Sequence, residues 1–269
     1  MQKGMMVPFF TEIPIRKRLE LMKKAGFDNL MFTIDRNHEK FMDTLENVLQ
    51  MCKEIGIGIS SAHAGYKEPD VVNFWFDNEL GNQIEQGYLN DIKFAGENGI
   101  EVVVFHLNFE TNYTLGQVGL NRLKNMVNQA NKYKVKLAIE NLYRREELDY
   151  IFEHMDDPYL GMCYDCGHEN FLTPNENFLQ KYPNKLFAVH LHDNDGVKDL
   201  HQKPFSNKID WQMVAKGLAK ANPVSLDGEI RIKRPEGKET ITEEEYYLEM
   251  LACYQSIEKL EKMIENYKL

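Results

Sequence analysis

Histidine and carboxylate residues stand at the ends of short apolar runs through most of the chain. These runs close with the strings SAH, FH, IEN, YD and HLHD, and a last one carries DGE. The ionisable residues at these ends are His63, His106, Glu140, Asp165, His190, His192 and Glu229. Imidazole and carboxylate groups gathered at one place are the ligand set of Zn²⁺ or Mn²⁺. A bound cation would also account for several carboxylates packed close together, which would otherwise repel one another or take up protons.

Two short spacings add further candidate ligands. Asp165 and His168 form a DxxH pattern around Gly167, and Asp199 and His201 form a DxH pattern. The first pair could instead be a helix N-cap and its neighbour, and the second pair could be solvated loop residues. We favour a metal site for both pairs, and we expect the flexibility of Gly167 to serve the first.

The segments that must position these residues alternate between short apolar runs and longer amphipathic patterns. The short runs predict strands over Lys3–Phe9, Asn29–Ile34, Ile57–His63, Glu101–Leu107, Lys136–Asn141, Leu160–Asp165, Lys185–Asp193 and Val224–Ile230. The longer patterns predict helices over Pro14–Ala25, Lys40–Ile55, Glu79–Asn98, Leu120–Tyr133, Glu146–His154, Glu176–Lys181, Ile209–Ala221 and Thr242–Asn266. Strict alternation of this kind predicts a (β/α)₈ TIM barrel, and we expect one domain over residues 1–269. A doubly wound open sheet is the rival, but VPFFTEIPI after the first strand holds no glycine-rich phosphate loop.

Residues two apart in a strand share a face, so the pattern also predicts which side chains point into the barrel. It groups the candidate ligands with small or branched residues of their own strands: Val102 and Val104 with His106, Ala138 with Glu140, Gly161 and Cys163 with Asp165, and Ala188 with His190 and His192. Strand ends of this kind form the rim where barrel enzymes build their sites. The last strand differs, because Asp227 shares the face of Glu229 and would lie one layer below it.

Composition narrows the class of protein. The chain has 269 residues, of which 43% are hydrophobic, and 42 acidic against 32 basic residues give a formal net charge of -10. Net acidity argues against a nucleic-acid partner. The sequence has no apolar run of 18 residues and no signal-peptide pattern, so we expect a cytoplasmic protein without a membrane partner. The CxxC of Cys163 and Cys166 lacks the second pair of a zinc knuckle, and we interpret both as packing residues.

The strings GMCYDCGHENFLTP, HLHDND…DLH and IEN resemble the xylose isomerase-like TIM-barrel superfamily. This group includes sugar isomerases and epimerases, inosose-pathway enzymes and endonuclease IV, and the resemblance covers nearly the whole chain. It implies, as in the epimerase-like members, one metal ion held by Glu140, Asp165, His190 and Glu229. In endonuclease IV a three-zinc cluster adds further ligands, which are matched here by His63, His106, His168, Asp199 and His201.

The sequence departs from this pattern in two loops. Residues 203–208 replace a glycine-rich LGxG-type stretch, and an aromatic cluster at residues 74–76 follows the third strand. We predict that Phe74 and Trp75 line the substrate pocket and stack on a sugar face, although packing on a neighbouring helix or subunit is equally compatible with the sequence. Arg144 is a candidate phosphate contact or a solvated helix-start residue. The extra imidazole, His192, is a candidate substrate contact, a support for a ligand, or a packed residue.

The resemblance implies a metal-dependent isomerase or epimerase of a sugar or polyol, phosphorylated or not, that works by proton transfer through an enediolate. Glu140 and Glu229 would act as base and acid, and the cofactor would be one to three divalent cations, with zinc first and manganese second. The alternative is an endonuclease IV-like phosphodiesterase acting at abasic sites in DNA, which the acidic charge and the aromatic loop disfavour. A third hypothesis is a metal-bound sugar-binding protein without catalysis. The sequence allows a homo-oligomer without setting the oligomeric state.

Overall fold

Eight parallel strands form a closed barrel in the computed structural model, which describes residues 1–7, 12–35, 42–65 and 70–268. In chain order the strands are β1 (Gln2–Met6), β2 (Asn29–Thr33), β3 (Gly58–His63), β4 (Val102–Phe105), β5 (Lys136–Glu140), β6 (Leu160–Asp165), β7 (Leu186–Leu191) and β8 (Ser225–Gly228). Each strand pairs with its neighbours in sequence, and β1 pairs with β8 to close the ring. The predicted (β/α)₈ barrel is confirmed.

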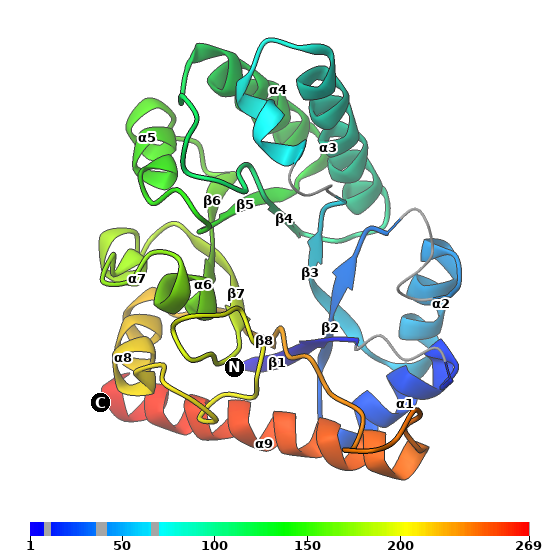
Figure 1. The fold of residues 1–269 in the computed structure, drawn as a ribbon. Coiled ribbons are helices and arrows are strands. Elements are labelled where there is room, and N and C mark those ends of the chain that lie inside the picture. Colours follow the sequence, from blue (N-terminus) through cyan, green and yellow to red (C-terminus); the bar gives the residue numbers. More distant parts are fainter. Residues whose placement is uncertain (8–11, 36–41, 66–69, 269) are drawn as a thin grey trace.

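Helices follow the strands and surround the barrel (Figure 1). They are α1 (Ile15–Ala25), α2 (Leu45–Ile55), the 3₁₀ helix η1 (Asp70–Trp75), α3 (Glu79–Glu97), α4 (Gln117–Tyr133), α5 (Glu146–His154), α6 (Cys166–Phe171), α7 (Phe178–Lys181), α8 (Trp211–Ala221) and α9 (Glu243–Lys268). The long α9 packs against α1 and α8. None of the helices in the described ranges is long and apolar enough to cross a membrane.

The predicted and observed elements differ mainly at their ends. The described part of β1 ends at Met6, and the predicted end of this strand, Phe9, lies outside the described residues. The start of the helix predicted from Lys40 also lies outside them; α2 begins at Leu45, where the Thr44 side chain accepts a hydrogen bond from the backbone N–H of Asn47. Two short helices, η1 and α6, were not predicted, because neither is long enough to show helical periodicity.

The barrel interior follows the predicted alternation. Its small and branched residues Val102, Val104, Ala138, Cys163 and Ala188 form one buried cluster. Glu140 and Asp165 each lie two residues nearer the carboxyl end of their strand than Ala138 and Cys163, and the register sets Glu140 beside Cys163 and Asp165 beside His190. Cys163 and Cys166 are buried free thiols, in keeping with their interpretation as packing residues.

Asp227 occupies a polar layer below the rim, as the alternation in strand eight predicts. It is 2% exposed, and the Ser225 hydroxyl group donates a hydrogen bond to its Oδ1 over 2.5 Å. The Ser60 side chain is a second hydrogen-bond partner, and burial raises the pKa of this carboxyl group. Gly4 makes room for it, because a Cβ atom at that residue would lie 2.1 Å from Oδ1.

A second buried carboxylate, Glu147 at the start of α5, joins three segments near the rim. Its Oε1 accepts hydrogen bonds from Trp75 Nε1 of η1 over 2.9 Å and from the Tyr113 hydroxyl group over 2.8 Å. Its Oε2 accepts one from Asn108 Nδ2, in the loop after β4, over 2.8 Å. Burial raises the pKa of Glu147 to about 7 against the lowering effect of these donors. The carboxylate therefore holds the loop after β4 and η1 against α5.

Replacing this carboxylate with a neutral amide should remove a pH dependence of stability. In the wild type the folded state holds the Glu147 proton more tightly than the unfolded state, whose pKa is near 4.5. The free energy of unfolding therefore falls as pH rises from about 4.5 to 7, by up to about 3 kcal/mol. In Glu147→Gln this loss should be absent, because the amide stays neutral and can donate to Asn108 Oδ1, which has no other partner in the described part of the chain.

Urea unfolding of both proteins at several pH values from 4.5 to 8 measures the difference. A free-energy gap between wild type and Glu147→Gln that stays constant over this range would contradict the assignment of the titration to Glu147.

Candidate metal centre

The carboxyl ends of strands β3 to β8 place imidazoles and carboxylates around one end of the barrel. A cavity of about 160 Å³ opens there. Its described wall consists of His106, Phe109, Glu140, Leu142, Tyr143, His168, Phe171, Leu172, Asp199, His201, Glu229 and Arg231. Pockets for drug-sized ligands are typically about 300–1,000 Å³, so this cavity suits a small ligand.

Four of the predicted ligands form the core of the site. Glu140, Asp165, His190 and Glu229 each offer a ligand atom, and these atoms all lie within 4.8 Å of one another. Nδ1 of His190 lies 3.1 Å from Glu229 Oε2, 3.4 Å from Glu140 Oε1 and 3.9 Å from Asp165 Oδ2. Glu140 and Asp165 are buried, whereas Glu229 is half-buried and faces the cavity. This is the four-residue set that the resemblance implied.

The chemistry of this donor set fits a divalent cation. Both ring nitrogens of His190 and Oε1 of Glu140 are buried and have no partner with hydrogen-bond geometry among the described residues. A buried polar atom left in this state costs about 1–3 kcal/mol, and more when it is charged. A cation bound between Nδ1 of His190 and Oε1 of Glu140 would satisfy both of these atoms, which supports the assignment of Glu140, Asp165, His190 and Glu229 as ligands.

Electrostatics keep the two glutamates ionised. Burial raises the pKa of Glu140 and of Glu229, but the charge of His190 and further contacts from nearby imidazoles lower both values more, so each pKa lies well below its ordinary range. Burial lowers the pKa of His190, and the groups around it, Cys163 first and then Glu140, raise it well above the ordinary value.

Two outer groups of residues adjoin the core, and each includes one core residue. The first contains Glu140 with His63 and His106, and the second contains Asp165 with His168, His192, Asp199 and His201. On one side, His106 Nε2 lies 2.9 Å from Glu140 Oε2, and His63 Nε2 lies 3.1 Å from His106 Nε2. On the other side, His168 Nδ1 lies 3.0 Å from Glu140 Oε1. The remaining predicted ligands, Asp199 and His201, contact each other over 2.6 Å and line the same cavity. All nine predicted metal-site residues therefore lie together.

Within the second outer group, His192 lies between Asp165 and His201. Its Nε2 lies 3.0 Å from Asp165 Oδ1, and its ring stacks on His201 with a centroid distance of 4.1 Å. Gly167 makes this possible, because a Cβ atom there would lie 1.9 Å from His192 Cε1. Gly167 lies in α6 and is not among the residues with positive φ. The structure therefore gives the site's need for glycine here as one of small size and not of a special backbone conformation.

Asp193 holds the loop that carries Asp199 and His201. Its carboxylate accepts hydrogen bonds from the backbone N–H groups of Asn207 and Ile209 and from Trp211 Nε1. Its backbone also pairs with Gln202. The loop after β7 thus folds back onto the end of that strand, and this brings the DxH pattern of Asp199 and His201 over the rim.

The predicted substrate contacts Phe74 and Trp75 do not face this cavity. Phe74 is fully buried and Trp75 is 3% exposed. The Trp75 ring packs near Tyr113 and Tyr150 and donates to Glu147, and Phe74 packs against Tyr88. The aromatic cluster is part of the helical layer, so the prediction that it stacks on a sugar is corrected to a packing role.

Arg144 is also occupied elsewhere. Its Nη1 donates to the Tyr113 carbonyl oxygen, and its guanidinium lies 4.6 Å from the centre of the Tyr113 ring. It is not among the described residues that line the cavity. The structure therefore gives no support to Arg144 as a phosphate contact, because the side chain braces the loop before α4.

Six of the described cavity residues were missed from the sequence, and Phe109, Tyr143 and Arg231 are among them. Phe109 and Tyr143 face the cavity from the loops after β4 and β5, and their rings lie 5.0 Å apart. Arg231 lines it from the segment after β8. Each of these three lies two or three residues after a predicted ligand in the sequence, and this short separation is the signal that could have identified it as a cavity residue.

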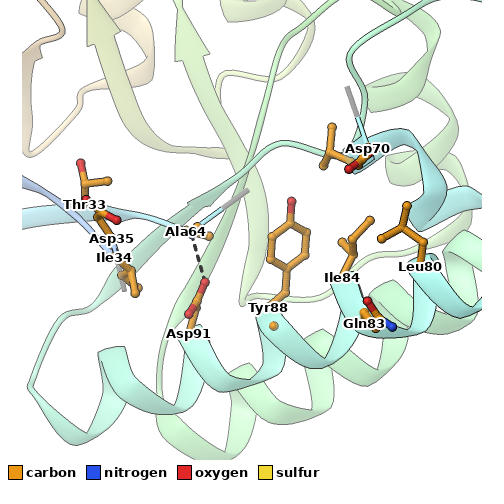
Figure 2. Close-up of a pocket in the computed structure, with 13 residues that line it drawn as sticks. Thr33, Ile34, Asp35, Ala64, Asp70, Leu80, Gln83, Ile84, Tyr88 and Asp91 are labelled. Carbon is orange, nitrogen blue, oxygen red and sulfur yellow. Dashed lines mark hydrogen bonds between the residues drawn. The ribbon is translucent and has the colours of Figure 1, made fainter. Parts of the chain in front are cut away.

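A larger cavity of about 520 Å³ lies between α3 and the ends of β2 and β3 (Figure 2). Its described wall includes Asp35, Asp70 and Asp91 but no histidine, and Oδ2 of Asp91 accepts a hydrogen bond from the backbone N–H of Gly65 over 3.1 Å. The candidate ligand groups of the described chain all gather at the smaller cavity instead.

Comparisons with known proteins agree with this architecture. The model of one protein family, the xylose isomerase-like TIM barrel, matches residues 19–256. A curated relative, the uncharacterized protein y4fM of Sinorhizobium fredii, is 23% identical over 267 residues, which cover 87% of this chain and 85% of the relative.

Solved structures share the fold over almost their whole length. A D-tagatose 3-epimerase-like protein superposes with a TM-score of 0.75 at 19% identity, covering 99% of this chain and 98% of the other. The IOLI protein, described with a binding zinc atom, superposes with a TM-score of 0.72 at 18% identity and 99% coverage of both chains. At such identities the likeness shows a common fold.

Asp165→Asn should weaken metal binding more than His63→Ala. Asp165 belongs to the core group and has no exposed surface, whereas His63 belongs to an outer group. Asparagine can still cap α6, as Asp165 does by accepting from the His168 N–H, so the loss should be confined to the charge. Loss of a supporting group typically costs ~10–100-fold in metal affinity, and loss of a charged core ligand should cost more. Zinc titration in competition with a chelating dye compares the two, and equal affinities would refute the division into core and outer groups.

Gly167→Ala should also weaken metal binding, by about tenfold or more, because the new methyl group displaces His192 from Asp165. Gly87→Ala is the matched control, since a Cβ atom there meets nothing within 4 Å. The same zinc titration serves both variants, with thermal unfolding to check the fold. Wild-type zinc affinity in a folded Gly167→Ala protein would show that His192 does not support Asp165.

Proposed function

This chain belongs to the xylose isomerase-like TIM-barrel family, and we propose that it is a metal-dependent isomerase or epimerase of a small sugar or polyol. The observation that carries the proposal is the core group of Glu140, Asp165, His190 and Glu229, whose ligand atoms lie within 4.8 Å of one another beside a cavity. The epimerase-like and zinc-containing proteins with the same fold support it.

The four core residues would hold one divalent cation, with zinc the first choice and manganese the second. When bound, the cation would polarise the adjacent carbonyl and hydroxyl oxygens of an open-chain sugar and so acidify the neighbouring C–H bond. The buried positions of Glu140 and Asp165 would keep water away from the inner side of the substrate.

Glu229 and Glu140 would move the proton. Glu229 is half-buried beside the cavity, and its Oε2 contacts His190, so the carboxylate can take a proton from a carbon atom in the cavity. Glu140 lies deeper, and contacts from His106 and His168 to its two oxygens fix its orientation. Proton transfer by positioned carboxylates typically contributes about 10²–10⁴-fold to a rate.

The walls of the cavity favour a small, partly apolar ring or chain. Phe109 and Tyr143 form an aromatic pair on one side and would pack against the carbon skeleton of a sugar. They take the role that the sequence had suggested for Phe74 and Trp75. With its volume of about 160 Å³, the cavity admits a molecule of sugar size or part of one.

A second candidate is an endonuclease IV-like phosphodiesterase. The specific observation in its favour is that all nine predicted ligand positions gather at one rim, in groups that adjoin one another. Two or three cations held there could clamp a phosphate and activate water. The formal net charge of -10 opposes it, because a long polyanion needs basic contacts along its backbone.

The first candidate is tested by hydrogen exchange. In heavy water, the zinc- or manganese-loaded protein should exchange one carbon-bound hydrogen of a ketose, an inosose or one of their phosphates for deuterium, as followed by NMR. Glu229→Gln should slow this exchange by about 10²-fold or more, whereas Glu258→Gln, a matched change on the exposed side of α9, should not. Metal content is measured in every sample, because Glu229 is also a proposed ligand.

Nicking of an abasic-site duplex is measured in parallel. Metal-dependent nicking by the wild type that is lost in Asp199→Ala, without exchange on any sugar, would overturn the first candidate in favour of the second. Metal binding and sugar binding without either activity would indicate a sugar-binding protein that lacks catalysis.

A further inference from the structure

We infer that the ligand of this site carries a terminal oxyanion, a phosphate or a carboxylate, which the Arg231 guanidinium binds at the mouth of the cavity. This inference deepens the proposed function, since it names the class of sugar derivative that the metal centre would take. It rests on the direction of the chain after β8, on the charges that line the cavity and on the absence, within the described residues, of an ion-pair partner for this guanidinium.

The segment after β8 points Arg231 toward the cavity. The backbone N–H of Glu229 donates to the Leu191 carbonyl oxygen over 3.1 Å, and that of Arg231 donates to the His201 carbonyl oxygen over 2.8 Å. The alternate residues Ile230 and Ile232 are buried in the hydrophobic core. Glu229 and Arg231, which alternate with these isoleucines in the sequence, line the cavity of the metal centre instead.

The groups that a bound molecule would meet differ in how deeply they are buried. Glu140 is 1% exposed, Glu229 is half-buried and Arg231 is exposed. A ligand that reaches the core group with one end would thus present its other end to Arg231, and a charged group in that place would be terminal and remote from the reacting carbon atoms.

Arg231 is the one residue with a permanent positive charge among the described residues that line the cavity. In the described part of the chain it forms no ion pair, although Asp199 and Glu229 line the same cavity. By contrast, Arg234 binds both carboxylate oxygens of Glu12, at 3.0 and 2.9 Å. The guanidinium of Arg231 is therefore available to a ligand.

A guanidinium in this position selects for an oxyanion. Its planar set of donors matches the paired oxygens of a phosphate or a carboxylate, and such pairs form the stronger class of hydrogen bonds. The histidines that line the cavity, His106, His168 and His201, are candidate metal ligands, which leaves Arg231 as the cationic side chain for a charge at the mouth. A phosphate and a carboxylate share this chemistry, so the experiment has to separate them.

Binding of unreactive polyols tests the inference without relying on turnover. Calorimetric titration of the zinc-loaded protein at fixed ionic strength compares D-glucitol, D-glucitol 6-phosphate and D-gluconate. Hydrogen bonds to a charged group are worth about 1.5–3 kcal/mol, so one of the two anions should bind about 10–100-fold more tightly than D-glucitol. The anion that shows the preference identifies the group as a phosphate or a carboxylate.

Arg231→Gln should abolish this preference, and Arg231→Lys should retain part of it, because lysine keeps the charge but not the paired donors. Lys233→Gln is the matched control, since Lys233 is an exposed cation two residues further on and does not line the cavity. Equal affinities of the wild type for all three polyols, or an anion preference that survives in Arg231→Gln, would overturn the inference.

These outcomes are distinct from those of the proposed reaction. A preference that depends on Arg231, together with no deuterium exchange on any sugar, would retain the anion site and remove the proposed activity. Deuterium exchange on neutral ketoses without any anion preference would retain the proposed activity and remove the anion site.

Discussion

The contacts of the Glu140 carboxylate set the geometry of this end of the barrel. This group is 1% exposed, and four imidazoles lie within 3.4 Å of its oxygens: those of His63, His106, His168 and His190. A buried carboxylate without such partners would cost several kcal/mol. The carboxyl ends of β3, β4, β6 and β7 must therefore lie at the same height along the barrel axis as the end of β5. The register of the strands in the barrel places them there.

The barrel and its ligands could be predicted from the sequence because both depend on periodicity. Alternation along a strand determined that His106 and Glu140 cap the layer of Val104 and Ala138, and the parallel order of strands determined that such caps meet at one rim. The ligand roles themselves came from the resemblance and stay predictions. The structure confirms that these residues converge at one rim and adds the distances among their ligand atoms.

The rest could not be predicted because it depends on how loops and short helices fold. An aromatic side chain buries its surface equally well against a sugar or a helix, and the hydrogen bond from Trp75 to Glu147, seventy-two residues away, decides between them. Phe109, Tyr143 and Arg231 lie beyond the strand ends, where alternation no longer gives a direction. The need for a small residue at Gly167 becomes visible only when His192 is seen beside it.

The barrel closes where β1 meets β8, and there the register sets Gly4 beside Asp227. Because a methyl group at residue 4 would occupy the place of the carboxylate, the two residues share one volume. Residue 4 cannot become larger while Asp227 stays, so evolution along this seam has to reduce the size of residue 227 first. A related chain with a small residue in place of Asp227 would be free to carry alanine at the other position. The residue that the first strand can carry at this place thus depends on a residue of the last strand, with which it pairs in the barrel.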